Sequence, residues 1–204
     1  MKIAILLIAV LFLIGFITAC ESTGDFSGDI HKIGEDKIIL IGSFELEPPL
    51  KPGEQNIAGF ETGKDYINKI IFTIENRNIK EAVRLANLDH CLKFDFGKTF
   101  YLEHKYSEEL YISFPSVWMS ATTRNLSSVT EVRGILSLPG PFLIKPPAGC
   151  RILYFGRVRY HRDADNNITE VEIIDEFDAV KKEAEQRYKT SIDMCRVRLQ
   201  VPEY

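Results

Sequence analysis

The chain has 204 residues, of which 45% are hydrophobic and 26% are charged, and its formal net charge is −4. This composition is typical of a globular protein and excludes a disordered, collagen-like or disulfide-rich scaffold chain. Because nucleic-acid binding usually requires a basic surplus, the acidic balance also argues against a nucleic-acid partner.

The first 19 residues are the most hydrophobic part of the sequence. Met1-Lys2 supplies one positive charge, and the apolar run 3–16 follows it, interrupted only by Gly15. A run of this length matches the core of a signal peptide better than the roughly 20 residues of a membrane-spanning helix. The run leads directly into Ile17-Thr18-Ala19-Cys20, where small residues precede a cysteine.

Ile17-Thr18-Ala19-Cys20 resembles the lipobox of bacterial lipoproteins, which signal peptidase II cleaves before the cysteine. The resemblance implies a signal peptide over residues 1–19 and a lipid on Cys20, with acyl chains such as palmitate holding the protein to a membrane. The remaining chain would carry 24 basic and 29 acidic side chains, since the first 19 residues hold one of the 25 basic residues and no acidic one. The alternative is an uncleaved amino-terminal anchor in which Cys20 has no special role.

Residues 20–36 are rich in Gly, Ser, Thr and acidic residues, and this composition predicts a flexible tether. Glu21 follows the cysteine where enterobacterial lipoproteins retained in the inner membrane carry Asp. The resemblance therefore favours the outer membrane slightly over the inner membrane, within a bacterial cell envelope.

Residues 37–204 are predicted to form a single β-rich domain, because apolar residues mostly alternate with polar ones along them. Alternation indicates strands near residues 38–46, 70–74 and 142–145. Further strands near 100–102 and 110–114 flank the polar stretch 103–109, which predicts a hairpin. The segment 78–88 fits either a short helix or a strand.

The clearest predicted hairpin joins 151–160 to 168–174, and a last strand covers 195–201. Between them, helical spacing of apolar residues predicts one helix over about 176–189, with Asp175 as its N-cap. The hairpin's first strand is expected to present Ile152, Tyr154, Val158 and Tyr160 on one face. Together these elements predict a mainly β fold, an antiparallel β-sandwich or barrel-like domain with one late α-helix.

Three cysteines remain after Cys20, namely Cys91, Cys150 and Cys195. The oxidising envelope allows one disulfide, and Cys150–Cys195 is favoured because these residues precede and open strands. The alternative is that all three are small buried hydrophobic residues.

No spacing typical of a zinc site, a nucleotide loop or a serine hydrolase occurs, so we predict no catalytic residue, metal or cofactor. Adjacent His90 and Cys91 would point to opposite faces of a strand and are not expected to form a catalytic pair. The loop Asp163-x-Asp165-x-Asn167 begins like a calcium loop, but Ile168 and Ile174 stand where Gly and Glu are required. We therefore interpret it as a solvated hairpin loop.

Arginines gather in the last third of the chain. Arg157 and Arg159 are expected to pair across the hairpin with Glu170 and Glu172. That pairing leaves Arg196 and Arg198 unexplained, so these two are the candidate anion or partner face. A second candidate surface is aromatic, although aromatic strand residues more often belong to a core. It comprises Tyr111, Trp118, Tyr154 and Tyr160.

The whole pattern resembles the small β-rich domains of bacterial envelope lipoproteins. We therefore expect a lipid-anchored, non-catalytic binding or structural module whose ligand or protein partner the sequence does not identify. One alternative is an envelope hydrolase, which would require a pocket where His90, His104 or His161 meets a carboxylate. Another is an assembly subunit of an envelope complex that docks through a sheet edge or an apolar patch.

Overall fold

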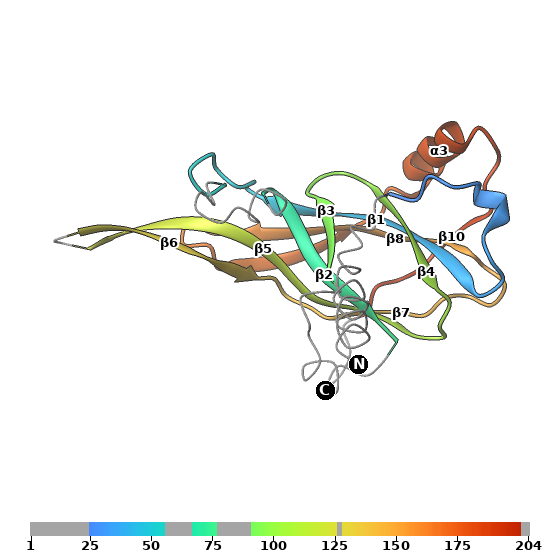
Figure 1. Cartoon of the computed structure of the whole chain (residues 1–204), viewed down its shortest axis with the longest axis horizontal. Helices are drawn as coiled ribbons and strands as arrows, with labels where there is room; N and C mark the ends of the chain where they lie inside the picture. The colour runs from blue at the N-terminus through green and yellow to red at the C-terminus, as the bar shows by residue number, and fades with distance from the viewer. Residues whose placement is uncertain (1–24, 56–66, 77–90, 126–127, 201–204) are drawn as a thin grey trace, which may run out of the picture.

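The computed structural model describes residues 25–55, 67–76, 91–125 and 128–200 (Figure 1). The described strands form two separate five-stranded sheets that pack face to face, so the fold is a β-sandwich and not a closed barrel. Sheet A has the order β10-β8-β1-β4, with β9 also pairing with β8, and sheet B has the order β3-β2-β5-β6, with β7 also pairing with β5. The strands of sheet A are β1 (Lys37–Glu47), β4 (Phe100–Lys105), β8 (Ile152–Arg162), β9 (Ile168–Ile174) and β10 (Met194–Arg196). Those of sheet B are β2 (Lys69–Glu75), β3 (Leu92–Asp95), β5 (Leu110–Asn125), β6 (Ser128–Ser137) and β7 (Phe142–Ile144).

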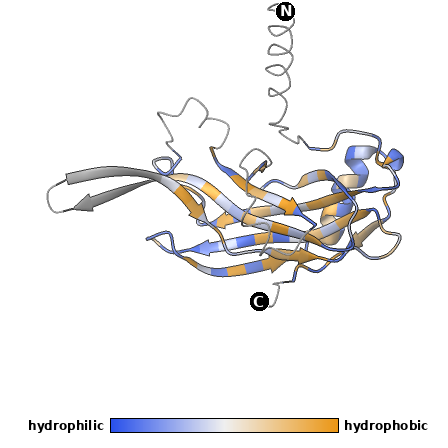
Figure 2. Ribbon diagram, turned by 60° about the horizontal axis from the view of Figure 1, so that its bottom comes forward, coloured by the Kyte–Doolittle hydropathy of each residue, from blue (hydrophilic) through white to orange (hydrophobic). Residues whose placement is uncertain are grey.

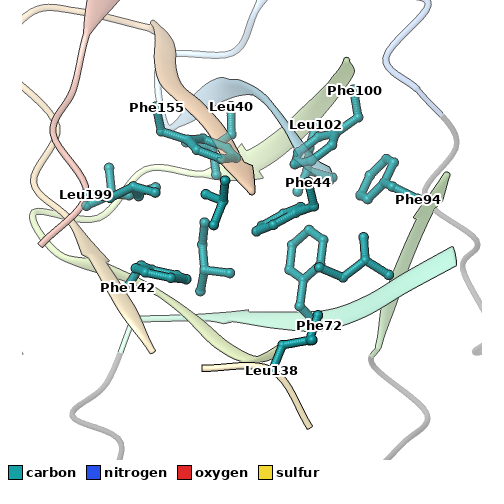
Figure 3. Packing of buried hydrophobic residues seen from close by; sticks show 14 of the residues in the cluster. Leu40, Phe44, Phe72, Phe94, Phe100, Leu102, Leu138, Phe142, Phe155 and Leu199 are labelled. Carbon is teal, nitrogen blue, oxygen red and sulfur yellow. The ribbon is translucent and has the colours of Figure 1, made fainter. Parts of the chain in front are cut away.

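The main hydrophobic core lies between the two sheets and is rich in phenylalanine (Figure 3). Phe44 of β1 is at its centre, with ring centroids 5.1 Å from Phe72 of sheet B and 6.0 Å from Phe155 of sheet A. Such tilted aromatic pairs contribute about 0.5–1.5 kcal/mol each beyond the area they bury. This core is what joins the two sheets.

A second, smaller core covers the outer face of sheet A. The helix α3 (Phe177–Tyr188) packs Val180 and Ala184 against Ile39 and Tyr154, while its other faces stay polar (Figure 2). β1 is therefore buried on both faces, which explains the unbroken apolar run at its start. β1 also lies at the centre of sheet A, antiparallel to β4 and parallel to β8.

The predicted late helix is confirmed within two residues at each end. The predicted N-cap, Asp175, is wrong by one residue: the N-cap is Glu176, whose side chain makes no capping bond. Asp175 still accepts a hydrogen bond from the Phe177 N–H at 2.9 Å. The helix ends at Tyr188, and the C-cap residue Lys189 adopts the left-handed conformation. In the described part of the chain, no helix is long and apolar enough to span a membrane.

The hairpin expected across residues 103–109 is wrong. β4 belongs to sheet A and β5 to sheet B, so the polar stretch carries the chain from one sheet to the other. Both strands direct their apolar residues into the same core from opposite sides, Leu102 from one and Ile112 from the other. The alternation of apolar and polar residues is the same whether β4 and β5 pair in one sheet or face each other from two sheets.

The predicted hairpin of β8 and β9 is present, but its first strand changes face at Gly156. Ile152 and Tyr154 pack under α3, whereas Val158 and Tyr160 enter the main core. Gly156 has φ +104°, and the register of β8 against β1 shifts here, as in a β-bulge. The expectation that these four residues share one face is therefore wrong, because the extra residue inverts the alternation.

Residues 25–36 do not form a tether. Phe26 packs its ring 6.2 Å from that of Tyr188 of α3, and η1 (Ile30–Lys32) buries Ile30 in the second core. The expected flexible tether is thus wrong for this part, because its few apolar residues find partners on the domain. Residues 1–24, including the proposed signal peptide and Cys20, lie outside the described residues, as does the segment 78–88.

β5 and β6 form a two-stranded ribbon that extends along the long axis of the molecule, away from the rest of the fold (Figure 1). Their pairing runs without interruption from Ser116 opposite Ser137 to Asn125 opposite Ser128. The last strand, predicted over 195–201, is shorter than expected. It consists of β10, and beyond it Gln200 forms a single antiparallel bridge to Leu143 of β7.

Candidate functional site

A pocket of about 300 Å³ opens on sheet A where β9 ends and the chain leaves β10. β9 and β10 both pair with β8, one with its second half and the other with its first three residues. Between them, the bulged Gly156 leaves a short stretch of β8 that neither strand covers. The pocket lies at this gap, and its size is at the lower end of the range for small-molecule sites.

The pocket has an apolar interior. Phe155 and Leu199 are buried there, and Ile173 of β9 is 47% exposed beside them, although it is one of the larger hydrophobic residues of the chain. A Cβ atom on Gly156 would lie 3.1 Å from the Ile173 Cγ2 atom, so the glycine keeps this region open. The full lining comprises Tyr154, Phe155, Gly156, Ile173, Ile174, Asp175, Arg196, Val197, Arg198 and Leu199.

Arg196 and Arg198, the two arginines singled out from the sequence, both line this pocket. Arg196 is held on the α3 side: its guanidinium lies 4.4 Å from the centre of the Phe177 ring and forms ion pairs with Asp175 at 3.5 Å and Asp178 at 3.7 Å. These three contacts give Arg196 a structural role beside α3.

Arg198 is different, because no described carboxylate lies within ion-pair distance of it. It is exposed and stands between the apolar residues Val197 and Leu199. An arginine beside an apolar pocket can offer up to five N–H donors to an anionic group. The arrangement therefore suits a ligand that carries an apolar part and an acidic part.

A disulfide fixes the wall that carries these arginines. Cys150 and Cys195 are joined, with Cα atoms 6.4 Å apart, and this is the pair that the sequence favoured. It ties the start of β8 to β10, and the Val197 N–H then donates to the Tyr154 carbonyl at 2.8 Å. The backbone at the pocket mouth is thus held on both sides. Cys91 takes no part in this disulfide.

The other predicted arginines form a charged cluster on the outer face of sheet A. Arg159 pairs with Glu172 as expected, at 3.3 Å, and also with Glu45 of β1 at 3.0 Å. Arg157 instead pairs with Glu45 and with Glu176, because the register places it opposite Ile174. The expected contact with Glu170 is therefore wrong for Arg157.

Histidine chemistry receives little support from the described residues. His161 lies 3.2 Å from Glu172, but Arg159 shares that carboxylate, and neither residue lines the pocket. His104 contacts the Lys105 carbonyl, and His90 lies outside the described residues. Within the described ranges, no group of three or more His, Cys, Asp or Glu is placed to hold a metal ion.

The remaining candidates belong to the framework. The Asp163 carboxylate accepts from the backbone N–H groups of Asp165 and Asn167, and these bonds stabilise the hairpin loop. Tyr154 and Tyr160 are buried, as expected for core aromatics. The apolar lining of the pocket was not predicted as part of a site, and it includes Phe155, Ile173, Ile174, Val197 and Leu199. The one sequence signal for Ile173 and Ile174 is an apolar pair that breaks the alternation at the end of β9.

Comparison with known proteins finds no matching family model, no matching curated protein and no matching solved structure.

Proposed function

We propose that this chain is a lipid-anchored lipoprotein of a bacterial cell envelope, and that its β-sandwich is a non-catalytic binding module for a small amphiphilic anion. The anchor is proposed from Ile17-Thr18-Ala19-Cys20 and the signal-like segment before it. The binding role is supported above all by the apolar pocket with Arg198 at its edge. The Cys150–Cys195 disulfide agrees with an oxidising compartment.

The pocket suggests the size and chemistry of the ligand. A volume of about 300 Å³ holds on the order of ten water-sized groups. Octanoate, a carboxylate on a short alkyl chain, is a probe of this size. Its chain would occupy the space beside Ile173 and Phe155, and its carboxylate would meet Arg198.

Calorimetric titration tests this role on the mature chain from residue 20 with Cys20→Ala, so that no lipid is present. We expect octanoate to bind more tightly than 1-octanol, by about tenfold, because a charge-assisted hydrogen bond contributes about 1.5 kcal/mol. In Arg198→Gln the two ligands should bind alike. Lys181→Gln removes the same charge away from the pocket and should keep the preference; a loss in both variants would refute a role for Arg198.

The anchor has its own test. Mass spectrometry of the amino-terminal peptide should find Cys20 as the first residue, carrying diacylglycerol and an acyl chain. Cys20→Ala should remove the lipid and release the mature chain from the membrane fraction. An unmodified Met1 on the native protein would refute the anchor.

The β5–β6 ribbon favours a second role, that of an assembly subunit. An isolated two-stranded ribbon has only marginal stability in water, and this one extends beyond the rest of the fold (Figure 1). If it docks on a partner, the detergent-solubilised native complex should exceed the mass of one chain. Deleting residues 120–133 should then return a single chain, and an unchanged mass would count against this role.

A further inference from the structure

The first two described residues are held firmly on the domain. Asp25 accepts a hydrogen bond from the Tyr101 N–H at 2.9 Å and forms an ion pair with Arg187 at 3.1 Å. The Phe26 N–H donates to the Tyr101 carbonyl at 2.7 Å, and the Tyr188 hydroxyl donates to the Phe26 carbonyl at 2.8 Å. Arg187 also lies 4.4 Å from the centre of the Tyr101 ring. The chain is therefore anchored to the body of the protein from Asp25 onward.

This attachment sets a limit on the reach of the lipid proposed at Cys20. Five Cα–Cα steps separate Cys20 from Asp25, and a fully extended chain spans at most about 17 Å over that length. A tether extending to Asp36 would have allowed roughly 55 Å. The surface around Asp25 must then stay near the bilayer, whereas a long tether would let the domain turn freely.

That surface is basic on an otherwise acidic protein. We define the Asp25 face as the residues that line a pocket of about 230 Å³ beside Asp25; its charged members are Asp25, Lys69, Lys93, Asp95 and Lys98. The lysines come from β2, from β3 and from the turn after β3. Asp95 contacts Lys98 at 2.7 Å and Lys69 at 3.7 Å.

The face thus offers three ammonium groups against two carboxylates, and Arg187 takes up the charge of Asp25. The whole chain, in contrast, has a net charge of −4. The negative potential of an anionic bilayer decays over a Debye length of about 8 Å, so only groups held close to the surface respond to it. The short connection of at most about 17 Å keeps this surface beside the bilayer, so these lysines can reach that range when the face turns toward the membrane.

We propose that the Asp25 face lies against the membrane and that Lys69, Lys93 and Lys98 contact anionic phospholipid headgroups. This inference rests on the proposed lipid at Cys20. It adds a fixed orientation to the anchor: the domain does not swing on a tether but presents one defined surface to the bilayer.

Lysine footprinting on the native lipidated protein tests the orientation without any substitution. Lys98 and Lys145 form a matched pair, with side chains 75% and 54% exposed and ion pairs of 2.7 and 2.9 Å to Asp95 and Glu109. These carboxylates raise the pKa of both amines. Lys145 does not belong to the Asp25 face. A membrane-impermeant amine reagent is applied to the protein in detergent, in phosphatidylcholine vesicles and in vesicles that also contain phosphatidylglycerol.

In the anionic vesicles we expect modification of Lys98 to fall about threefold or more relative to detergent, while Lys145 changes little. The protection should be weaker in the neutral vesicles. Equal changes at the two lysines would overturn the orientation, and equal protection in both kinds of vesicle would overturn the headgroup contact. The same digest reports the amino-terminal peptide: if it carries no lipid, the proposed anchor fails and the orientation fails with it.

Discussion

Replacing Arg162 by lysine should lower the free energy of unfolding by about 3 kcal/mol. Arg162 is the last residue of β8, and its side chain is 2% exposed. Each of its five N–H groups has an acceptor, which makes this a complete use of the guanidinium group. The acceptors are the Pro48 carbonyl, the Pro49 carbonyl, both carboxylate oxygens of Glu54 and the Asn166 side-chain oxygen.

The magnitude follows from counting donors. Lysine supplies three N–H groups from one nitrogen and cannot reproduce the planar fork that binds both oxygens of Glu54. At least two of the five acceptors then lose their partner. Because a hydrogen bond to a charged group contributes about 1.5–3 kcal/mol, the loss of two such bonds costs about 3 kcal/mol.

Urea unfolding followed by the fluorescence of Trp118, the only tryptophan, measures this loss. With a slope of about 2 kcal/mol per molar urea, the midpoint should fall by about 1.5 M. Arg159→Lys is the control, since Arg159 is 28% exposed and its ion pairs with Glu45 and Glu172 remain accessible to water. Its loss should stay under about 1 kcal/mol. Equal midpoint shifts in the two variants would refute this reasoning.

The hydrogen-bonded salt bridge with Arg162 lowers the pKa of Glu54 in the folded protein. The stability that the Glu54 carboxylate contributes is therefore present above the unfolded pKa of about 4.5 and is lost as the pH falls through the folded pKa. The difference in unfolding free energy between the native chain and Glu54→Gln should therefore shrink from pH 6 to pH 3, and a constant difference would contradict it. Dithiothreitol should lower the urea midpoint of the native chain, because the Cys150–Cys195 bond, with a sequence separation of 45, contributes up to about 4 kcal/mol by loop entropy; in Cys150→Ala it should change nothing. Gly156→Ala and Gly97→Ala both place alanine at positive φ, but only the methyl at Gly156 meets close neighbours, so urea unfolding should show a loss larger by about 1 kcal/mol there. Similar losses of stability at the two glycines would be evidence against close packing of Ile173 and Ile174 around Gly156.

The elements that sequence predicted well are those whose pattern is complete within a short segment. The α3 helix repeats its apolar residues at helical spacing around Val180 and Ala184, and the β8–β9 hairpin has a turn-rich loop between two alternating strands. Both patterns depend on neighbours along the chain. The sandwich architecture followed from the number of such strands.

The wrong predictions concern relations that a local pattern does not contain. Leu102 and Ile112 alternate in the same way whether β4 and β5 form a hairpin or face each other from two sheets. Gly156 was visible in the sequence, but its positive φ, which inverts the faces of β8, was not. Phe26 was assigned to a tether because its partner, Tyr188, lies 162 residues further along the chain.

The candidate site shows the same division. Arg196 and Arg198 stood out because the predicted cross-strand pairs did not explain them, and both line the pocket. The apolar part of the pocket could not be predicted, because Ile173 lies at a gap where β9 and β10 both end along β8. This gap depends on how β9 and β10 both pair with β8, which a local sequence pattern does not contain.

The parallel contact between β1 and β8 makes the order of synthesis important. Glu45 pairs with Arg159, 114 residues later, so the centre of sheet A cannot form until most of the chain exists. At about 5–20 residues per second, the ribosome adds that length in roughly 6–23 s. During this delay the apolar run Ile38–Ile41, buried on both faces in the finished fold, has no native partner on one side. An incomplete chain of this topology therefore leaves the edge of this apolar run unpaired until β8 is available.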